Sequence, residues 1–230
     1  MSRFAPDAYL DLSQTAHPAL FRGLTHVWEA LPRIGPYLQE LLERNGPAFH
    51  GTRLGEPYIG ANVFIGEGTV VEPGAVIKGP AWIGANCEIR AGAYVRDNVI
   101  VGDGAVLGNS CEFKNCVLFN GCQVPHYTYV GDSILGHKVH LGAGAILSNF
   151  KLAGDGITVR ADGEAFPTGL RKFGAIVGDK AEVGCQAVLN PGTILGRETV
   201  IYPGVVWNGV LAARTIVKHR PEYHLAPKRS

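Results

Sequence analysis

The sequence lacks several features that would assign it quickly to a functional class. Its 230 residues carry a formal net charge of only +1, so no global electrostatic attraction to nucleic acid is expected. No stretch approaches the ~20 consecutive apolar residues that a membrane-spanning helix requires. Arg3, Asp7 and Asp11 precede any sustained apolar run, so we expect no signal peptide. We therefore expect a globular, cytoplasmic protein that binds neither nucleic acid nor membrane.

The cysteines lack the arrangement that a disulfide framework or a zinc site would need. There are five of them, an odd number, and none belongs to a CxxC pair. We therefore predict reduced thiols that fill turns, and no metal ligands among them. They are Cys87, Cys111, Cys116, Cys122 and Cys185.

Glycine, in contrast, is abundant, and it accompanies a strict apolar repeat. The 31 glycines are about twice the usual ~7% share, yet they form no Gly-X-Y triplets. From residue 59 an apolar residue occupies every sixth position: Ile59, Ile65, Val71, Ile77, Ile83, Ile89, Val95, Val101, Leu107, Phe113 and Phe119. Strands alternate every two residues and helices every 3.6, so a period of six requires short straight segments joined by tight turns. Glycine and asparagine supply the turn conformations.

This pattern resembles the hexapeptide repeat of left-handed parallel β-helix proteins, in which three hexads form one triangular coil. The resemblance covers about residues 57–150 and 176–210, and the second block resumes with Val177, Val183, Leu189, Leu195, Ile201 and Trp207. It implies an all-β fold in which residues 51–213 form the β-helix. Residues 149–175 abandon the repeat and are expected to form an extruded loop, with a hairpin turn at residues 161–163.

The two ends of the chain lack the repeat. Residues 1–50 contain a helical stripe interrupted by Pro32 and Pro36, and then a second short helix that ends at Asn45. The stripe consists of Leu20, Leu24, Val27, Trp28 and Leu31. We expect this segment to be a helical cap or a trimer-packing arm. Residues 214–230 form a basic tail, in which Arg214, Lys218, Arg220, Lys228 and Arg229 accompany the single acid Glu222.

The count of six fails near residue 125. The repeat predicts inward positions at Pro125 and Gly131, and neither residue suits one. The phase resumes two residues early, with Tyr129, Leu135, Leu141 and Leu147. A shortened corner re-aims the local side chains, and His126 lies inside it. We predict a functional role for His126, because an imidazole with a pKa near 6.5 can remove a proton from an amine near neutral pH.

Arg96 and Lys114 lie eighteen residues apart, which is one coil of the predicted β-helix. Each follows an inward residue, so we expect the two side chains to stack on the same outward face as a two-cation clamp. A phosphate suits such a clamp, because the arginine guanidinium can bind it through two parallel hydrogen bonds. His126 lies two hexads beyond Lys114.

The segment "VPHYTYVGDSILGHKVHLGAGAILSN" is similar to the acetyltransferase half of the bifunctional N-acetylglucosamine-1-phosphate uridyltransferase/glucosamine-1-phosphate acetyltransferases. The archaeal-type sugar-phosphate nucleotidyltransferases are closer still, since they share "TGLRKFGAIVGD" after the loop. The resemblance implies that His126 is the general base and that Tyr129 contacts the sugar phosphate. It implies that Asn149 holds the sugar and orients the base, and that Arg96 and Lys114 bind the phosphate.

The same resemblance implies the reaction. It points to an acetyl-CoA-dependent N-acetyltransferase acting on a hexosamine 1-phosphate, with glucosamine 1-phosphate as the first choice, in UDP-N-acetylglucosamine biosynthesis. No metal is required for acetyl transfer. Acetyl-CoA is expected at a subunit junction of a homotrimer, with its phosphates near Lys218 and Arg220. A backbone N–H between Gly142 and Ala145 would stabilise the oxyanion.

The sequence also departs from the family pattern. Phe150 and Lys151 follow Asn149, where bacterial members have a tyrosine and a nearby substrate-contacting lysine. Lys151 or Lys172 could replace that lysine, although neither occupies a matching position. No glycine-rich phosphate loop of a nucleotidyltransferase opens the chain, so we do not expect this polypeptide to make UDP-sugars by itself; a separate nucleotidyltransferase chain could be a partner.

Two other functions stay open at this point. The chain could bind sugar phosphates, or a partner nucleotidyltransferase, without catalysis, because function depends on the site and not on the fold. It could also be a γ-carbonic-anhydrase-like zinc enzyme that uses His126, His137 and His140. The gaps of eleven and three between these histidines differ from that family's long gap followed by five.

Overall fold

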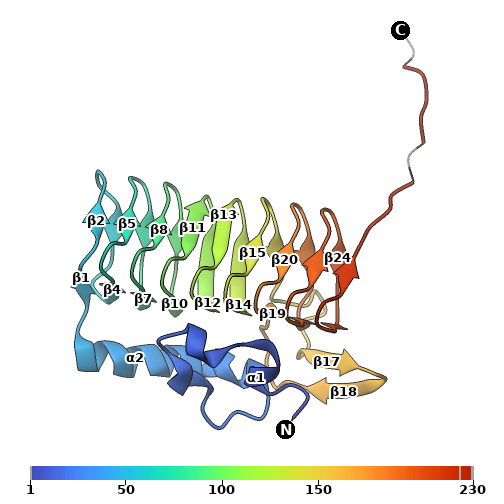
Figure 1. Ribbon diagram of the computed structural model, residues 1–230, viewed down its shortest axis with the longest axis horizontal. Helices are drawn as coiled ribbons and strands as arrows, with labels where there is room; N and C mark the ends of the chain where they lie inside the picture. The colour runs from blue at the N-terminus through green and yellow to red at the C-terminus, as the bar shows by residue number, and fades with distance from the viewer. Residues whose placement is uncertain (1, 223, 229–230) are drawn as a thin grey trace.

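The computed structural model describes residues 2–222 and 224–228 and folds most of them into one parallel β-helix (Figure 1). Short strands wind through about nine turns, and each strand pairs in parallel with the strand one coil away. The left-handed parallel β-helix that the sequence implies is confirmed.

The coils stack into three flat faces. Face 1 contains β1 (Ala48–Phe49), β4 (Val63–Ile65), β7 (Ala81–Ile83), β10 (Val99–Val101), the second halves of β12 (Glu112–Leu118) and β14 (Tyr129–Leu135), β19 (Ala175–Val177), β22 (Thr193–Leu195) and β25 (Val210–Leu211). Face 2 contains β2 (Thr52–Arg53), β5 (Val70–Val71), β8 (Glu88–Ile89), β11 (Val106–Asn109), β13 (Gln123–His126), β15 (His140–Leu141), β20 (Glu182–Val183), β23 (Val200–Ile201) and β26 (Ile216–Val217). Face 3 contains β3 (Tyr58–Ile59), β6 (Val76–Ile77), β9 (Tyr94–Val95), the first halves of β12 and β14, β16 (Ile146–Leu147), β21 (Val188–Leu189) and β24 (Val206–Trp207).

The interior of the solenoid is an aliphatic column, as the repeat predicts. Ile77, Leu107 and Leu141 are each 0% exposed, and nearly every inward position packs against its equivalent in the neighbouring coils. Burial of this apolar surface is the main favourable term in folding. The tight turns between faces need left-handed backbone, which asparagine adopts more readily than most residues; Asn98 has a φ of 58°.

Two successive coils in the middle of the solenoid are one residue shorter than the usual eighteen. Val99 pairs with Cys116, and Cys116 pairs with Ser133, a spacing of seventeen, whereas Ala81 and Val99 are eighteen apart. We call residues 99–115 and 116–132 the short coils. Their shortened corners lie at Asn115 and Asp132, each with a φ of 46°.

The short coils correct the sequence-based register. The inward series runs through Phe113, Leu118, Val124, Val130 and Leu135. The predicted inward residues Phe119 and Tyr129 are therefore wrong, because each lies one position away from an inward residue. The phase shifts in two steps of one residue, and neither step occurs at His126. The inward positions move by one residue at each shortened corner, and intact hexads separate the two corners. In the sequence these two steps resemble a single shift of two residues near His126.

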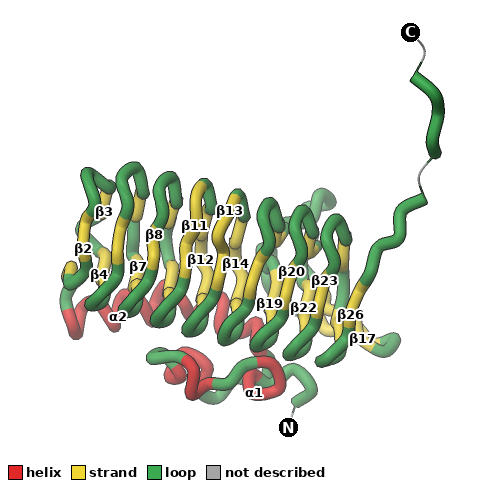
Figure 2. The backbone as a smooth tube through the Cα atoms, turned by 45° about the horizontal axis from the view of Figure 1, so that its top comes forward, coloured by secondary structure: helices red, strands yellow, loops and turns green. Residues whose placement is uncertain are grey.

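The amino-terminal segment packs along face 1 of its own chain (Figure 2). It contains α1 (Pro6–Tyr9), the 3₁₀ turns η1 (Leu12–Gln14), η2 (Pro18–Phe21) and η3 (Val27–Arg33), and α2 (Ile34–Asn45). The expected helical stripe forms 3₁₀ turns instead of a continuous α-helix: Pro18 begins η2 and Pro32 lies inside η3, whereas Pro36 interrupts nothing and lies in the first turn of α2. The side chains of Ile100, Val117, Phe119 and Ile134 point out of face 1 and form a second buried core with this arm.

The inserted loop forms the expected hairpin. β17 (Thr158–Ala161) pairs antiparallel with β18 (Glu164–Pro167), and the turn contains Asp162 and Gly163 with positive φ. The chain then returns to the solenoid, since Ile134 pairs with Ile176. Ile157 and Phe173 join the core beneath the amino-terminal arm, so the loop is packed against the solenoid and does not project freely.

The carboxyl-terminal end differs slightly from the expected boundary. β26 extends the solenoid to Val217, beyond residue 213. The described residues after it run away from the body, as Figure 1 shows, and are exposed. Arg229 lies outside the described residues. In the described ranges no helix is both long enough and apolar enough to cross a membrane.

The five cysteines are free, as predicted, but Cys116 lies within β12 and not in a turn. Cys87, Cys111, Cys116 and Cys122 are buried, while Cys185 is exposed. Burial raises the pKa of the Cys122 thiol to about 12. A thiol held in its protonated form is a poor nucleophile and a poor metal ligand, so the buried cysteines are structural.

Candidate functional site

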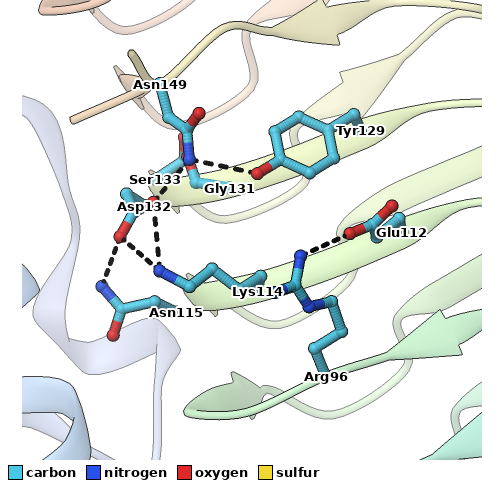
Figure 3. A network of polar contacts seen from close by, with 9 residues as sticks. All are labelled: Arg96, Glu112, Lys114, Asn115, Tyr129, Gly131, Asp132, Ser133 and Asn149. Atoms are coloured by element: carbon cyan, nitrogen blue, oxygen red, sulfur yellow. Dashed lines mark hydrogen bonds and ion pairs between the residues drawn. The ribbon is translucent and has the colours of Figure 1, made fainter. Parts of the chain in front are cut away.

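Four of the residues singled out in the sequence meet at the corner between face 3 and face 1 (Figure 3). Because Val95 pairs with Phe113, the next residues, Arg96 and Lys114, stack one above the other as expected. Tyr129 begins the same face in the next coil, and Asn149 follows the strand after that. We call this cluster the polar corner.

Each cation of the expected clamp already has a carboxylate partner. The Arg96 guanidinium lies 2.8 Å from Glu112, and the Lys114 ammonium lies 3.2 Å from Asp132. The hydrogen bond from Arg96 to Glu112 raises the pKa of the arginine. The polar corner is therefore a set of ion pairs and does not carry two free positive charges. The sequence interpretation missed both acids; Asp132 was visible as the end of the quoted "YVGD" segment.

Asp132 connects most of the polar corner. Its carboxylate accepts hydrogen bonds from Lys114, from Asn115 Nδ2 at 2.9 Å and from Asn149 Nδ2 at 2.6 Å. Asn149 Nδ2 also donates to the Tyr129 hydroxyl at 3.0 Å. Partial burial of Tyr129 raises its pKa, and the nearby charge of Asp132 adds to the shift. The short coils make these contacts possible, since they bring Asp132 into line with Asn115.

Glycine at position 131 allows the tyrosine to lie flat against the strand. A Cβ at Gly131 would collide with the Tyr129 hydroxyl. The ring therefore crosses face 3, and its hydroxyl reaches Asn149 at the far edge (Figure 3).

An open pocket of ≈ 670 Å³ adjoins the polar corner. Tyr129, Asn149, Phe150, Arg171 and Lys172 line it. The last two residues come from the inserted loop, which is anchored here by a hydrogen bond from Phe173 N to Asn149 O at 3.0 Å. This pocket is large enough for a small polar ligand.

The inserted loop supplies the unpaired positive charge. Arg171 and Lys172 are exposed, and neither forms an ion pair among the described residues. The Arg171 guanidinium lies 5.6 Å from the centre of the Phe150 ring. Lys151 instead pairs with Asp155 at 3.2 Å. Of the two candidate replacement lysines, Lys172 lines the pocket and Lys151 does not; Arg171 was missed, although it lies in the quoted "TGLRKFG" segment.

His126 does not reach the polar corner within one chain. It ends β13 at the opposite edge of face 3, and its side chain is exposed. Asp132 lies six positions further along the chain, and at ~3.3 Å per residue of strand the two are up to about 20 Å apart. Among the described residues the His126 side chain has no hydrogen-bond partner.

The other expected residues lie along the His126 edge. Gly144 N donates to His126 O at 3.0 Å, Gln186 N donates to Ala143 O at 2.9 Å, and Gly204 N donates to Cys185 O at 2.9 Å. These backbone contacts form a row parallel to the solenoid axis. Lys218 lies at its end, 5.1 Å from the Tyr202 ring, and Arg220 follows in the exposed tail.

The N–H groups expected to hold an oxyanion are largely occupied. Gly142 N donates to Val183 O, and Ala145 N donates to Gly142 O. Gly144 N is also used, by His126 O. Within the described ranges, Ala143 is the residue of this turn whose N–H forms no such bond.

The histidines of the zinc alternative do not converge in one chain. His137 Nδ1 lies 2.8 Å from Asn120 O, and His140 Nδ1 lies 2.8 Å from Glu182. In the part of the chain that the structure describes, no three histidine, cysteine or acidic side chains are grouped as metal ligands. A single chain therefore lends the zinc alternative no support.

Parts of the chain are similar to known proteins. Residues 77–163 match the family model described as the GMPPB C-terminal domain. A bifunctional sugar-1-phosphate nucleotidylyltransferase/acetyltransferase of Sulfurisphaera tokodaii is 35% identical over 95 residues, which are 41% of this chain and 24% of that protein. A bifunctional protein GlmU of Methanococcus maripaludis is 31% identical over 205 residues, which are 89% of this chain and 49% of that protein.

The chain thus spans about half or less of the length of these curated relatives. Among solved structures, the acetyltransferase domain of PglB from Neisseria gonorrhoeae, in complex with acetyl coenzyme A, is 15% identical and covers 89% of this chain and 80% of that one. Its TM-score is 0.30, so this likeness carries no further weight. The sequence similarity to the curated relatives confirms the resemblance that the sequence indicated. The chain is a hexapeptide-repeat β-helix protein that resembles the C-terminal region of bifunctional sugar-1-phosphate nucleotidylyltransferase/acetyltransferases.

Proposed function

We propose that the chain is an acetyl-CoA-dependent N-acetyltransferase whose acceptor is a hexosamine 1-phosphate, with glucosamine 1-phosphate as the first candidate. One observation carries the proposal. The polar corner borders a pocket in which Arg171 and Lys172 supply free positive charge and Asn149 and Tyr129 supply polar groups. Cations bind a phosphate, and the neutral polar groups suit a sugar. The names of the relatives add acetyl transfer to sugar-phosphate chemistry.

In this proposal the sugar phosphate binds first to Arg171 and Lys172. Arg96 and Lys114, in the adjoining polar corner, then turn toward the phosphate. To bind the phosphate, Arg96 must weaken its ion pair with Glu112, and Lys114 must weaken its ion pair with Asp132.

His126 is the proposed general base. It removes a proton from the acceptor amine as the nitrogen attacks the thioester carbonyl. The new C–N bond forms, the C–S bond breaks, and the thiolate of coenzyme A leaves and takes up a proton. Ala143 N–H is the proposed oxyanion donor, because its hydrogen is free and it stacks next to His126. Acetyl-CoA follows the His126 edge, with its phosphates near Lys218 and Arg220.

A homotrimer is part of the proposal, because within one chain the general base is far from the residues that would bind the sugar phosphate. His126 and the polar corner lie on opposite edges of face 3. In a cyclic trimer, the His126 edge of one subunit faces the polar corner of the next, and three complete sites form. Apolar side chains exposed on face 3 and at its edge in the single chain are available for such burial: Tyr58, Tyr127 and Val206 are 60–65% exposed.

Thiol release from acetyl-CoA tests the proposal, with glucosamine 1-phosphate, galactosamine 1-phosphate and no acceptor. We expect acceptor-dependent release that falls by ~10²–10⁴-fold in His126→Ala, because that is the usual contribution of a general base. His140→Ala is the matched control, since His140 lies on face 2 and pairs with Glu182. Wild-type rates in a folded His126→Ala protein contradict the assignment of the base. Sedimentation that shows only monomer contradicts the shared site.

A second candidate function is sugar-phosphate binding without turnover, in support of a separate nucleotidyltransferase chain. The pairing of Arg96 and Lys114 with carboxylates and the distance of His126 from the polar corner favour it. Calorimetric binding of the sugar phosphate with no thiol release identifies this alternative.

A further inference from the structure

Asp132 is a buried carboxylate for which the proposed mechanism has no role of its own. Its side chain is 6% exposed. It accepts hydrogen bonds from Lys114 Nζ at 3.2 and 3.4 Å, from Asn115 Nδ2 at 2.9 Å and from Asn149 Nδ2 at 2.6 Å. A buried carboxylate with this many donors is held rigidly, and it holds its partners in turn.

The contact with Asn149 decides which way that amide faces. An ionised carboxylate can only accept, so the nitrogen of Asn149 must be the atom that meets Asp132. The second hydrogen of the same nitrogen goes to the Tyr129 hydroxyl at 3.0 Å. Both hydrogens are therefore used inside the protein, and an amide turned by 180° would place its oxygen against the carboxylate and lose the bond to Asp132.

The oxygen of Asn149 is left on the other side. Figure 3 shows it directed away from Asp132. It accepts no hydrogen bond from any described residue, and Asn149 lines the pocket with Arg171 and Lys172. Asn149 thus has an amide oxygen without a donor among the described residues, and it lines the same pocket as two cations that would attract an anion.

We infer that Asp132 is a positioning residue that locks the Asn149 amide with its oxygen toward the pocket, and that this oxygen selects ligands carrying an N–H or O–H donor near the phosphate-bearing carbon. The inference rests on the proposed function and extends it to the choice of acceptor. A hexosamine 1-phosphate has an amine at the adjacent carbon, whereas a 2-deoxyhexose 1-phosphate has no donor there.

Calorimetric binding of glucosamine 1-phosphate and 2-deoxyglucose 1-phosphate tests the inference. Wild type should prefer glucosamine 1-phosphate by roughly 10-fold, the value of one charge-assisted hydrogen bond. Asp132→Asn leaves the size of the side chain unchanged but allows the Asn149 amide to turn, so the preference should approach one. Asn149→Ala should lose it equally, and the double variant should lose no more than Asn149→Ala alone. Losses that multiply in the double variant overturn the inference, because Asp132 then does not act through Asn149.

Asp179→Asn is the matched control. Asp179 is 5% exposed in the same solenoid, and it accepts hydrogen bonds from Asp11 N and His137 N, away from the pocket. Its loss should lower stability and leave the ligand preference at the wild-type value. Wild-type NMR needs no variant: both Asn149 Nδ2 protons should exchange slowly with solvent, and fast exchange overturns the inference even if Asp132→Asn does not fold.

The experiments distinguish failure of the proposed acetyltransferase activity from failure of the positioning role of Asp132. A 10-fold preference with no thiol release overturns acetyl transfer and supports the positioning role. Thiol release with an unchanged preference in Asp132→Asn overturns the positioning role and supports the enzyme. If wild type binds neither sugar phosphate, both are overturned.

Discussion

The regular coils before residue 99 and the two short coils after it are built from the same hexad, yet they differ in chemistry. In the regular coils the corner between faces 3 and 1 carries Asn62, Pro80 and Asn98, beside the first turn of α2. In the short coils the same corner carries Asn115 and Asp132, and it holds an ion pair and an ordered amide. The coils that are one residue shorter thus carry a polar site at this corner, while their interior stays buried and apolar.

The most severe way to break this comparison is to restore the missing residue. Inserting one glycine between Asn115 and Cys116 gives the first short coil the ordinary length of eighteen. The interior should still stack, but Asp132 should lose its alignment with Asn115 and Lys114. We expect at least a ~100-fold loss of thiol release, since a displacement of about 1 Å at a site has that effect.

The control for this insertion is a glycine placed after Asp162, at the exposed tip of the hairpin. It should leave both turnover and the circular dichroism spectrum unchanged. Retention of full turnover by the Asn115 insertion would show that the short corner has no role in the site.

A smaller effect should come from the outer side of the short coils. Phe119 is 0% exposed beneath the amino-terminal arm, in edge contact with Phe21 at 5.6 Å. Phe119→Ala should lower the free energy of unfolding by about 3–5 kcal/mol, because it removes a large buried ring and leaves a cavity. Urea unfolding measures the change.

Phe64→Ala is the matched variant on face 1 of the regular coils. Phe64 is only half-buried, and it stacks on Trp82 at 3.7 Å. Its replacement should have a clearly smaller effect than that of Phe119. Equal losses of unfolding free energy would mean that burial beneath the arm makes Phe119 no more stabilising than the half-exposed Phe64.

The smallest expected effect is a pH dependence of the arm itself. Burial lowers the pKa of His17 from 6.5 to about 4, although nearby Asp103 opposes the shift. The folded state keeps the ring neutral, so the unfolded state binds more protons between these two values. This part of the stability is complete above pH 6.5 and decreases as the pH falls toward 4, by up to about 3 kcal/mol.

Urea unfolding of wild type and His17→Gln at pH 7.5, 6 and 5 measures this effect. The glutamine variant should have a shallower dependence on pH, because it has no ring to protonate. The same slope in both proteins would assign the acid sensitivity to other groups.

Much of the fold could be predicted because the repeat is local. An aliphatic residue every six positions specifies the strand, the turn and the inward direction without reference to distant parts of the chain. The stacking of Arg96 on Lys114 followed from the same count, since both precede the first shortened corner. The count failed after Phe113, where a single missing residue moves every later side chain by one position. A second missing residue then hid the first.

The candidate site was harder to predict, because its charges depend on contacts between coils. The sequence indicated two cations, but it did not show that Glu112 and Asp132 approach them from the neighbouring coils. It named Lys172 only as one of two alternatives, because the path of the loop between residues 149 and 175 follows no repeat. The proposed trimer would be a further level of contact, beyond the single chain.

The sequence by itself determined the β-helix, its aliphatic interior and the hairpin of the inserted loop, because each arises from local periodicity or a local turn. Only the tertiary structure decided which side chains meet at the polar corner, since Lys114, Asp132 and Asn149 lie seventeen or eighteen residues apart and meet only when the coils stack. The structure also decided that the apolar outer side of face 1 is covered by the chain's own arm. Local pattern fixes the conformation of each coil, whereas the chemistry of the site depends on the alignment between coils, which one residue more or less can change.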